Sequence, residues 1–209
     1  MAINLSKVTL DKATPTISLA KSGDGQGTMR VNLNWTAGTA APAKGLFGKL
    51  KATAAPSIDL DLAAMYELAD GSVGIVQALG NGFGALNQRP FIHLDGDDRS
   101  GSNTAGENLH INLADITQFR RILIFAYIYE GAPNWSQANG VVTLFPTSGP
   151  QVEVKLDSAD NQAISCAIAM LESNGRELTV TREVRYIRGY QDKVDEAYGF
   201  GMNWSRARK

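Results

Sequence analysis

Acidic side chains gather in two short stretches of this chain, and their types and spacing are suited to metal chemistry. The longer stretch is Asp95-Gly-Asp-Asp-Arg-Ser-Gly-Ser-Asn-Thr-Ala-Gly-Glu107, and the shorter is Asp59-Leu60-Asp61. Two carboxylates about 4 Å apart repel each other by roughly 4 kcal/mol at an effective dielectric near 20. A hard cation such as Ca²⁺, which takes six to eight oxygen ligands, would offset that repulsion. The pattern therefore predicts a calcium site with six candidate ligands: Asp59, Asp61, Asp95, Asp97, Asp98 and Glu107.

The longer stretch matches the calcium loop of an EF-hand only in part. With Glu107 at position 12, Asp98 falls on position 3 and Gly101 on the glycine at position 6, but Gly96 stands at position 1, where an acid is needed. The flanking segments alternate apolar and polar residues as strands do, and they lack a helical period. We therefore expect a loop between two strands that closes around the metal.

The shorter stretch needs a strand to position it. Side chains two apart on a strand point to the same face, so Asp59 and Asp61 would project together while Leu60 and Leu62 enter a core. Residues 58–68 are ambiguous, since residues 62–68 would also form a helix by propensity. The Asp-Gly pair at 70–71, which precedes another apolar run, favours a hairpin instead.

Strand patterns with turn signals between them fill most of the remaining chain. The most apolar run, 122–128, predicts a central strand, and the Asn-Gly pair at 174–175 predicts a hairpin between two long strands. Trp135 is placed in a polar turn. One helical turn is expected within 114–119 and a short helix near 190–197. The sequence predicts an all-β fold, a two-sheet β-sandwich of about ten strands with one or two short helices.

Residues 37–57 form the one compositional break, rich in small residues and containing three lysines. Such a segment buries little apolar surface, so we expect a flexible insertion in a single domain that spans residues 1–209. Its Leu46-Phe47 pair could dock on a partner or a membrane surface, but a solvated loop is the favoured interpretation of the segment.

The amino-acid composition limits the classes of function that the chain can have. The chain has 209 residues, 44% of them hydrophobic, which suits one large all-β domain. Its net charge of −1 gives no general attraction to nucleic acid. The single cysteine, Cys166, excludes an internal disulfide and suits a reducing compartment. Because no signal peptide or transmembrane-length apolar run is seen, we expect a cytoplasmic protein.

Three rival chemistries have weaker support in the sequence. A zinc site needs clustered cysteine and histidine, whereas His93, His110 and Cys166 are scattered. The glycine-rich run at 80–84 lacks the lysine and the following helix of a phosphate-binding loop, which favours an ordinary turn. A hydrolase could use a carboxylate pair, Asp61 with Asp98 or Asp97 with Glu107, but one acid would then need a raised pKa in a cleft.

Several motifs in order resemble the TerD family of tellurium-resistance and stress-response proteins. They are Ile58-Asp-Leu-Asp-Leu-Ala-Ala64, Gly96-Asp-Asp-Arg-Ser-Gly101 and Gly106-Glu107, and the ending Tyr198-Gly-Phe-Gly-Met-Asn-Trp204 is similar to the TerA-type branch. The resemblance covers most of the chain. It implies a β-sandwich that binds calcium through acidic loops, without established catalysis.

Three functions are therefore open at this point. The first is a calcium-binding, non-catalytic interaction module of the stress-response type, whose partners would be other proteins of the same type. The second is a carboxylate-dependent hydrolase on the same scaffold. The third is a metal-independent assembly module that uses residues 37–57 or the basic C-terminal region, which contains Arg182, Arg185, Arg188, Lys193, Arg206, Arg208 and Lys209.

Overall fold

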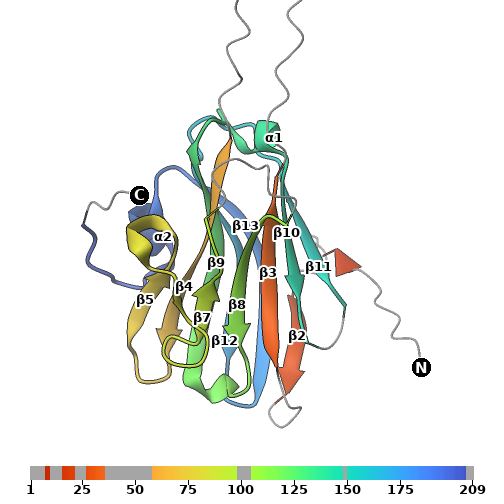
Figure 1. Ribbon diagram of the computed structural model, residues 1–209, viewed down its shortest axis with the longest axis vertical. Coiled ribbons are helices and arrows are strands. Elements are labelled where there is room, and N and C mark those ends of the chain that lie inside the picture. Colours follow the sequence, from red (N-terminus) through yellow and green to blue (C-terminus); the bar gives the residue numbers. More distant parts are fainter. Residues whose placement is uncertain are drawn as a thin grey trace, which may run out of the picture.

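A computed structural model describes residues 8–9, 16–21, 27–35, 58–97, 105–147 and 150–205 of the chain. These residues form two β-sheets that pack face to face, with short helices at the ends and on one outer face (Figure 1). The predicted all-β sandwich is confirmed. The described residues form thirteen strands where about ten were expected, because strands of two or three residues are too short to show alternation in the sequence.

The first sheet has seven strands, in the order β1-β11-β10-β3-β8-β7-β6. All neighbours are antiparallel except β1 and β11, which pair in parallel. Its strands are β1 (Val8–Thr9), β3 (Thr28–Asn34), β6 (Gly84–Ala85), β7 (Ile92–Leu94), β8 (Glu107–Asn112), β10 (Gly140–Phe145) and β11 (Val152–Leu156).

The second sheet has six strands, all antiparallel, in the order β2-β13-β12-β9-β4-β5. Its strands are β2 (Thr16–Lys21), β4 (Asp59–Leu68), β5 (Val73–Val76), β9 (Phe119–Glu130), β12 (Ser165–Ser173) and β13 (Glu177–Ile187). The expected hairpins β4–β5 and β12–β13 are both present, and β9 is central as its apolar sequence predicted.

The space between the sheets holds the main core. Alternate residues of β3 and β8, among them Val31, Leu33 and Ile111, are fully buried there, and Leu60 and Leu62 enter it from β4. Fully burying one such side chain is worth about 1.5–3 kcal/mol. The inward direction of Leu60 and Leu62 places the alternate residues of β4, Asp59 and Asp61, on the opposite face of the strand.

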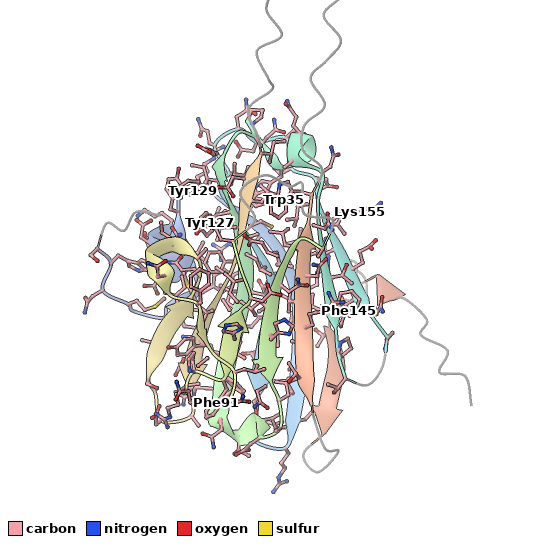
Figure 2. The ribbon with its side chains drawn as sticks, in the orientation of Figure 1. Trp35, Phe91, Tyr127, Tyr129, Phe145 and Lys155 are labelled. Carbon is pink, nitrogen blue, oxygen red and sulfur yellow. The ribbon has the colours of Figure 1, made fainter. Side chains whose placement is uncertain are left out.

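A second apolar layer covers the outer face of the six-stranded sheet. Phe125 and Tyr127 of β9 pack there with Val194 of α2 (Gln191–Tyr198) and with Phe200, which follows that helix. Figure 2 labels Tyr127 on the side of the sandwich where α2 lies. Because the middle of β9 is covered on both faces, its residues 122–128 form a continuous apolar run with no polar alternation.

Three shorter helical segments lie in the described loops: η2 (Leu79–Asn81), η3 (Ile116–Gln118) and α1 (Trp135–Ala138). The helical turn expected within 114–119 and the helix near 190–197 are confirmed by η3 and α2. The expected polar turn around Trp135 is wrong. Trp135 begins α1, is fully buried and donates a hydrogen bond from Nε1 to the carbonyl oxygen of Ala163 at 2.8 Å.

The segment expected to be a flexible insertion, residues 37–57, lies outside the described residues. None of the helices in the described part of the chain is long and apolar enough to cross a membrane.

Candidate metal centre

The first half of β4 has one edge that no described strand covers. β4 pairs with β9 along its length, but β5 pairs only with residues 64–67. Its N-terminal end is fixed to the first sheet by Trp35, whose Nε1 donates a buried hydrogen bond to the carbonyl oxygen of Ile58 at 2.8 Å. Residues 59–63 therefore form a strand edge that is fixed in place and faces the loop between β7 and β8.

Glu107, the first residue of β8, reaches this edge from the other sheet. Its Oε2 accepts a hydrogen bond of 2.7 Å from the backbone N–H of Leu62, and its side chain is only 1% exposed. An unsatisfied buried N–H costs about 1–3 kcal/mol. The carboxylate therefore supplies the hydrogen-bond acceptor that a neighbouring strand would otherwise offer to the Leu62 N–H.

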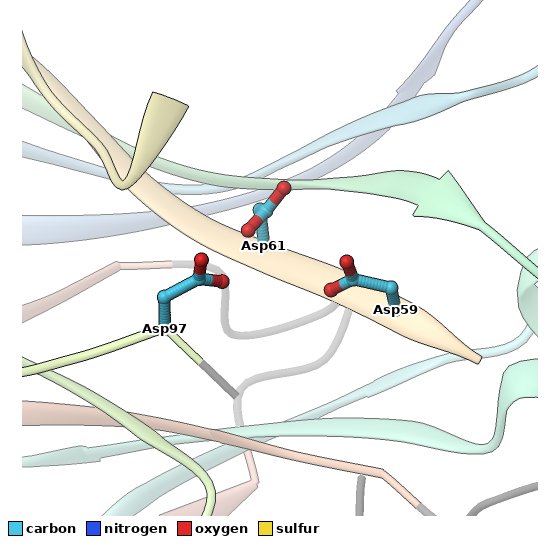
Figure 3. A group of neighbouring side chains, drawn as sticks. All are labelled: Asp59, Asp61 and Asp97. Carbon is cyan, nitrogen blue, oxygen red and sulfur yellow. The ribbon is translucent and has the colours of Figure 1, made fainter. Parts of the chain in front are cut away.

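Three carboxylates converge beside this edge. Asp59 and Asp61 project from β4, and Asp97 faces them from the loop that follows β7 (Figure 3). One oxygen from each of the three lies within 4.8 Å of the others. Asp59 and Asp61 are almost completely buried, at 1% and 0% exposure. Two of these three acids thus lie in the protein interior.

Asp95 supports the loop and is directed toward β8. Its Oδ1 accepts a hydrogen bond from the backbone N–H of Asn108 at 3.1 Å, and its own backbone N–H donates to the carbonyl oxygen of Asn108. Oδ2 lies 3.6 Å from Nε2 of His110, which pairs across the strands with His93. These contacts fix the point at which the loop leaves β7.

The loop ends enclose a cavity of about 340 Å³ between residues 95–97 and 105–108, lined in part by Asp97 and Glu107. Asn32 of β3 anchors its far side by donating from Nδ2 to the carbonyl oxygen of Ala105 at 2.7 Å. Gly106 has φ +63°, and a Cβ there would lie 2.2 Å from the carbonyl oxygen of Leu33. Only glycine fits this close approach between loop and strand.

Tyr127 borders the acidic cluster from β9, where it pairs with Asp61 in the strand register. Burial raises the pKa of the Tyr127 hydroxyl far above its ordinary value, and the nearby charges of Asp61 and Glu107 raise it further. The phenol is therefore neutral at all physiological pH values. It can donate a proton to a hydrogen bond with a carboxylate but cannot add another negative charge.

The structure thus brings together three of the six predicted ligands, Asp59, Asp61 and Asp97, and places Glu107 beside them. Asp95 contacts the backbone of β8, and Asp98 lies outside the described residues. Sequence reasoning missed Asn32 and Tyr127. Both residues reach the site through the register between neighbouring strands, and no local sequence motif around either residue predicts this.

The donor set suits a hard divalent cation. All three converging ligands are carboxylate oxygens, the atoms that Ca²⁺ and Mg²⁺ prefer, and no sulfur or imidazole belongs to the cluster. Ca²⁺–oxygen distances of about 2.3–2.6 Å allow ligand oxygens up to about 5 Å apart in one shell. The spread of the cluster therefore fits a single calcium ion, with room in the adjoining cavity for water or further oxygen ligands.

Comparison with known sequences gives one strong similarity. The chain is 44% identical over 209 residues to the tellurium resistance protein TerA of Alcaligenes sp., an alignment that covers 99% of this chain and 60% of that protein. The chain thus spans about three fifths of the length of this relative. No family model matches the chain.

Two solved structures share the fold. A protein of unknown function, SAV2460, superposes with a TM-score of 0.59 at 14% identity, covering 86% of this chain and all of that one. A homologue of the telluride resistance protein TerD, SCO6318 from Streptomyces coelicolor A3(2), gives a TM-score of 0.53 at 17% identity, covering 80% of this chain and 94% of that one. At these identities the likeness concerns the fold alone.

Proposed function

We propose that this chain, a TerA-like member of the tellurium-resistance proteins, binds calcium at the centre formed by Asp59, Asp61 and Asp97 and acts as a non-catalytic interaction module. The observation that carries the proposal is the approach of three carboxylates from two distant segments to within 4.8 Å. Two of them are buried, and burying carboxylate charge is costly unless a counter-charge or hydrogen bonds offset it. A bound divalent cation supplies such a counter-charge.

The two sides of the site differ in what they provide. Asp59 and Asp61 lie on a strand that is paired with β9 and held by Trp35, so their positions are largely fixed before binding. Asp97 belongs to a loop of the other sheet. An ion held by all three would connect that loop to β4, and the loop surface would become the part of the protein that responds to calcium. Asp95, Asp98 and Glu107 stay as predicted supporting ligands.

The geometry favours chelation over hydrolysis. In glycosidases the two catalytic carboxyl groups stand about 5–5.5 Å or 6.5–9.5 Å apart, on either side of the bond to be broken. Here three carboxylate oxygens lie within 4.8 Å of one another, close enough for all three to coordinate one ion. From the family resemblance we further propose a role in binding other stress-response proteins of the same type, with a link to tellurium resistance through the TerA relative.

Calcium titration calorimetry and thermal melting in calcium and in chelator test the proposal. At a hundredfold excess over the dissociation constant, calcium should stabilise the protein by about 2.7 kcal/mol. Asp97→Asn, at a half-buried loop position, should weaken binding at least tenfold while the fold survives. Glu172→Gln, which removes an exposed acid far along β12, is the matched control and should bind normally. A wild-type protein with no binding heat and no shift in melting temperature would refute the calcium proposal.

A further inference from the structure

We propose that a second site, separate from the acidic cluster, binds an organic cation with an alkylammonium or guanidinium group. The site is a cavity of about 760 Å³ between the end of β9, the start of α2 and residues 204–205. Its volume lies within the range of about 300–1,000 Å³ that small-molecule sites occupy. Tyr127 borders both this cavity and the acidic cluster, but none of Asp59, Asp61 and Asp97 lines the cavity, so the proposal requires no bound calcium.

Aromatic side chains form much of the wall. Tyr129, Tyr190 and Trp204 all line the cavity, and they are 37%, 46% and 36% exposed. In the part of the chain that the structure describes, Val73 is the one other large hydrophobic side chain exposed to this degree. Exposed apolar surface gathered at one concave place marks a binding site, whereas scattered exposed residues need no explanation.

Hydrogen bonds hold the ring of Trp204 and the backbone of Tyr190 in position. Nε1 of Trp204 donates to Oδ2 of Asp195 at 2.7 Å, and Asp195, only 4% exposed, also accepts from the backbone N–H groups of Gly201 and Met202. Tyr190 is the N-cap residue of α2, and its carbonyl oxygen accepts from the N–H of Val194. A preformed aromatic wall loses little entropy when a ligand binds.

The charged groups of the cavity are acidic. Glu130 and Asp192 line it, together with the buried amides of Gln77 and Gln191, which hydrogen-bond each other at 3.0 Å. No lysine or arginine is among its described lining residues. The N-terminus of α2 would by itself favour an anion, but Asp192 in its first turn opposes that field. Aromatic faces combined with carboxylates attract ammonium and guanidinium ions.

Fluorescence titration can detect the ligand directly. Trp204 is 36% exposed, whereas Trp35 and Trp135 are 3% and 0% exposed, so a bound ligand should change the emission of Trp204 alone. The probes are choline for a free quaternary amine, and Nα-acetyl-lysine methylamide and methylguanidinium for the side chains of a protein partner. The neutral isostere of choline, 3,3-dimethylbutan-1-ol, is the matched control. We expect saturable binding of at least one cation, in chelator as well as in calcium, and much weaker binding of the neutral alcohol.

Variants assign the binding to this cavity. Tyr190→Ala and Glu130→Gln should each weaken binding about three- to thirtyfold, with calorimetry as the readout. Val73→Ala, which removes the exposed apolar residue outside the cavity, should leave binding unchanged. Because Arg206, Arg208 and Lys209 follow Ser205 in the sequence and could compete, the titration is repeated on a chain that ends at Ser205. Equal affinity for choline and the neutral alcohol, no effect of either variant, or no binding by either chain would overturn the proposal.

Discussion

Glu107 of one sheet accepts a hydrogen bond from the backbone N–H of Leu62 in the other sheet, at 2.7 Å, and both residues are buried. The bond joins the start of β8 to the edge of β4 that β5 does not reach. The negative charge of the same carboxylate, like that of Asp61, also acts on the hydroxyl group of Tyr127 and raises its pKa. Glu107 thus has a structural role, which needs only an oxygen that accepts a hydrogen bond, and a proposed electrostatic role, which needs a negative charge.

Substitutions at Glu107 should separate these two roles. Glu107→Ala leaves the Leu62 N–H without its acceptor, so we expect a loss of about 1–3 kcal/mol in unfolding free energy, measured by urea denaturation in chelator. Glu107→Gln keeps an oxygen that can accept the bond and should lose much less. The same Glu107→Gln protein should bind calcium more weakly because a charge is gone. Equal stability of the alanine variant and the wild type would contradict the structural role.

Asp61→Asn should have opposite effects with and without metal. In chelator, removing one of three crowded negative charges should leave the protein as stable or more stable, by up to roughly 1–4 kcal/mol. In calcium, the variant should lack the stabilisation that the wild type gains. Melting temperatures under both conditions provide the check, and Glu172→Gln should behave as the wild type does in each. Loss of stability in chelator would show that the hydrogen bonds of the Asp61 carboxylate outweigh the repulsion among the three acids, which would contradict this prediction.

The ion pairs of Glu67 should make stability depend on pH. Its oxygens accept from Nη1 of Arg120 and Nε of Arg121, both at 2.7 Å. The hydrogen bond from Arg120 holds the pKa of Glu67 below its ordinary value of 4.5, Arg121 adds to this, and partial desolvation opposes both. Because the folded pKa is the lower one, this stabilisation is complete above about pH 4.5 and is lost as the pH falls through the folded value.

Glu67→Gln should therefore cost about 0.5–1 kcal/mol at neutral pH, as expected for ion pairs near the surface. The difference from the wild type should shrink in urea denaturation below about pH 4.5. A difference that stays constant down to about pH 3 would assign the effect to packing and not to charge.

Arg121 should control the segment that carries Trp204. Its guanidinium donates to the carbonyl oxygens of Tyr198 and Gly199, at 2.8 and 3.0 Å, and lies 4.2 Å from the ring centroid of Phe200. Arg121→Ala should speed amide hydrogen exchange at residues 199–204 and weaken binding in the aromatic cavity. Arg120→Ala is the matched control, since Arg120 is 68% exposed and makes only the Glu67 contact among those described. Similar exchange in both variants would count against this role for Arg121.

The sequence predicted much of this architecture because alternation is a local property. The two-sheet fold and the shared direction of Asp59 and Asp61 follow from side chains that alternate along one strand. The central position of 122–128 follows from its unbroken apolar run, which is typical of a strand covered on both faces. The expected approach of Asp97 to Asp59 and Asp61 is also found. That prediction rested only on the repulsion between carboxylates of two acidic segments, which one shared cation would offset.

The parts that sequence reasoning missed depend on long-range contacts. Asp59 and Asp61 are almost completely buried, although a strand with two acids on one face would be expected to turn that face to solvent, and nothing near Asp59 in the sequence indicates their burial. Trp135 has polar neighbours in the sequence, which wrongly predicted an exposed turn. Its buried indole is stabilised by the carbonyl oxygen of Ala163, 28 residues away, and a local pattern cannot show that contact. The aromatic cavity likewise joins distant segments, from Gln77 to Ser205.

Gly106 provides the sharpest test of how the metal loop is held. Its φ of +63° and the 2.2 Å approach of a built Cβ to the Leu33 carbonyl oxygen mean that Gly106→Ala must strain the backbone or move the loop. We expect a loss of about 1–3 kcal/mol in stability and weaker calcium binding, because Ala105 and Glu107 are its neighbours.

Gly96→Ala is a matched control within the same loop, since its φ is not positive and a Cβ there meets nothing within 4 Å. That change should leave stability equal or raise it by about 0.4–1 kcal/mol. If both alanine variants bind calcium as the wild type does, the loop is not held at Gly106 in the way that its contact with β3 requires.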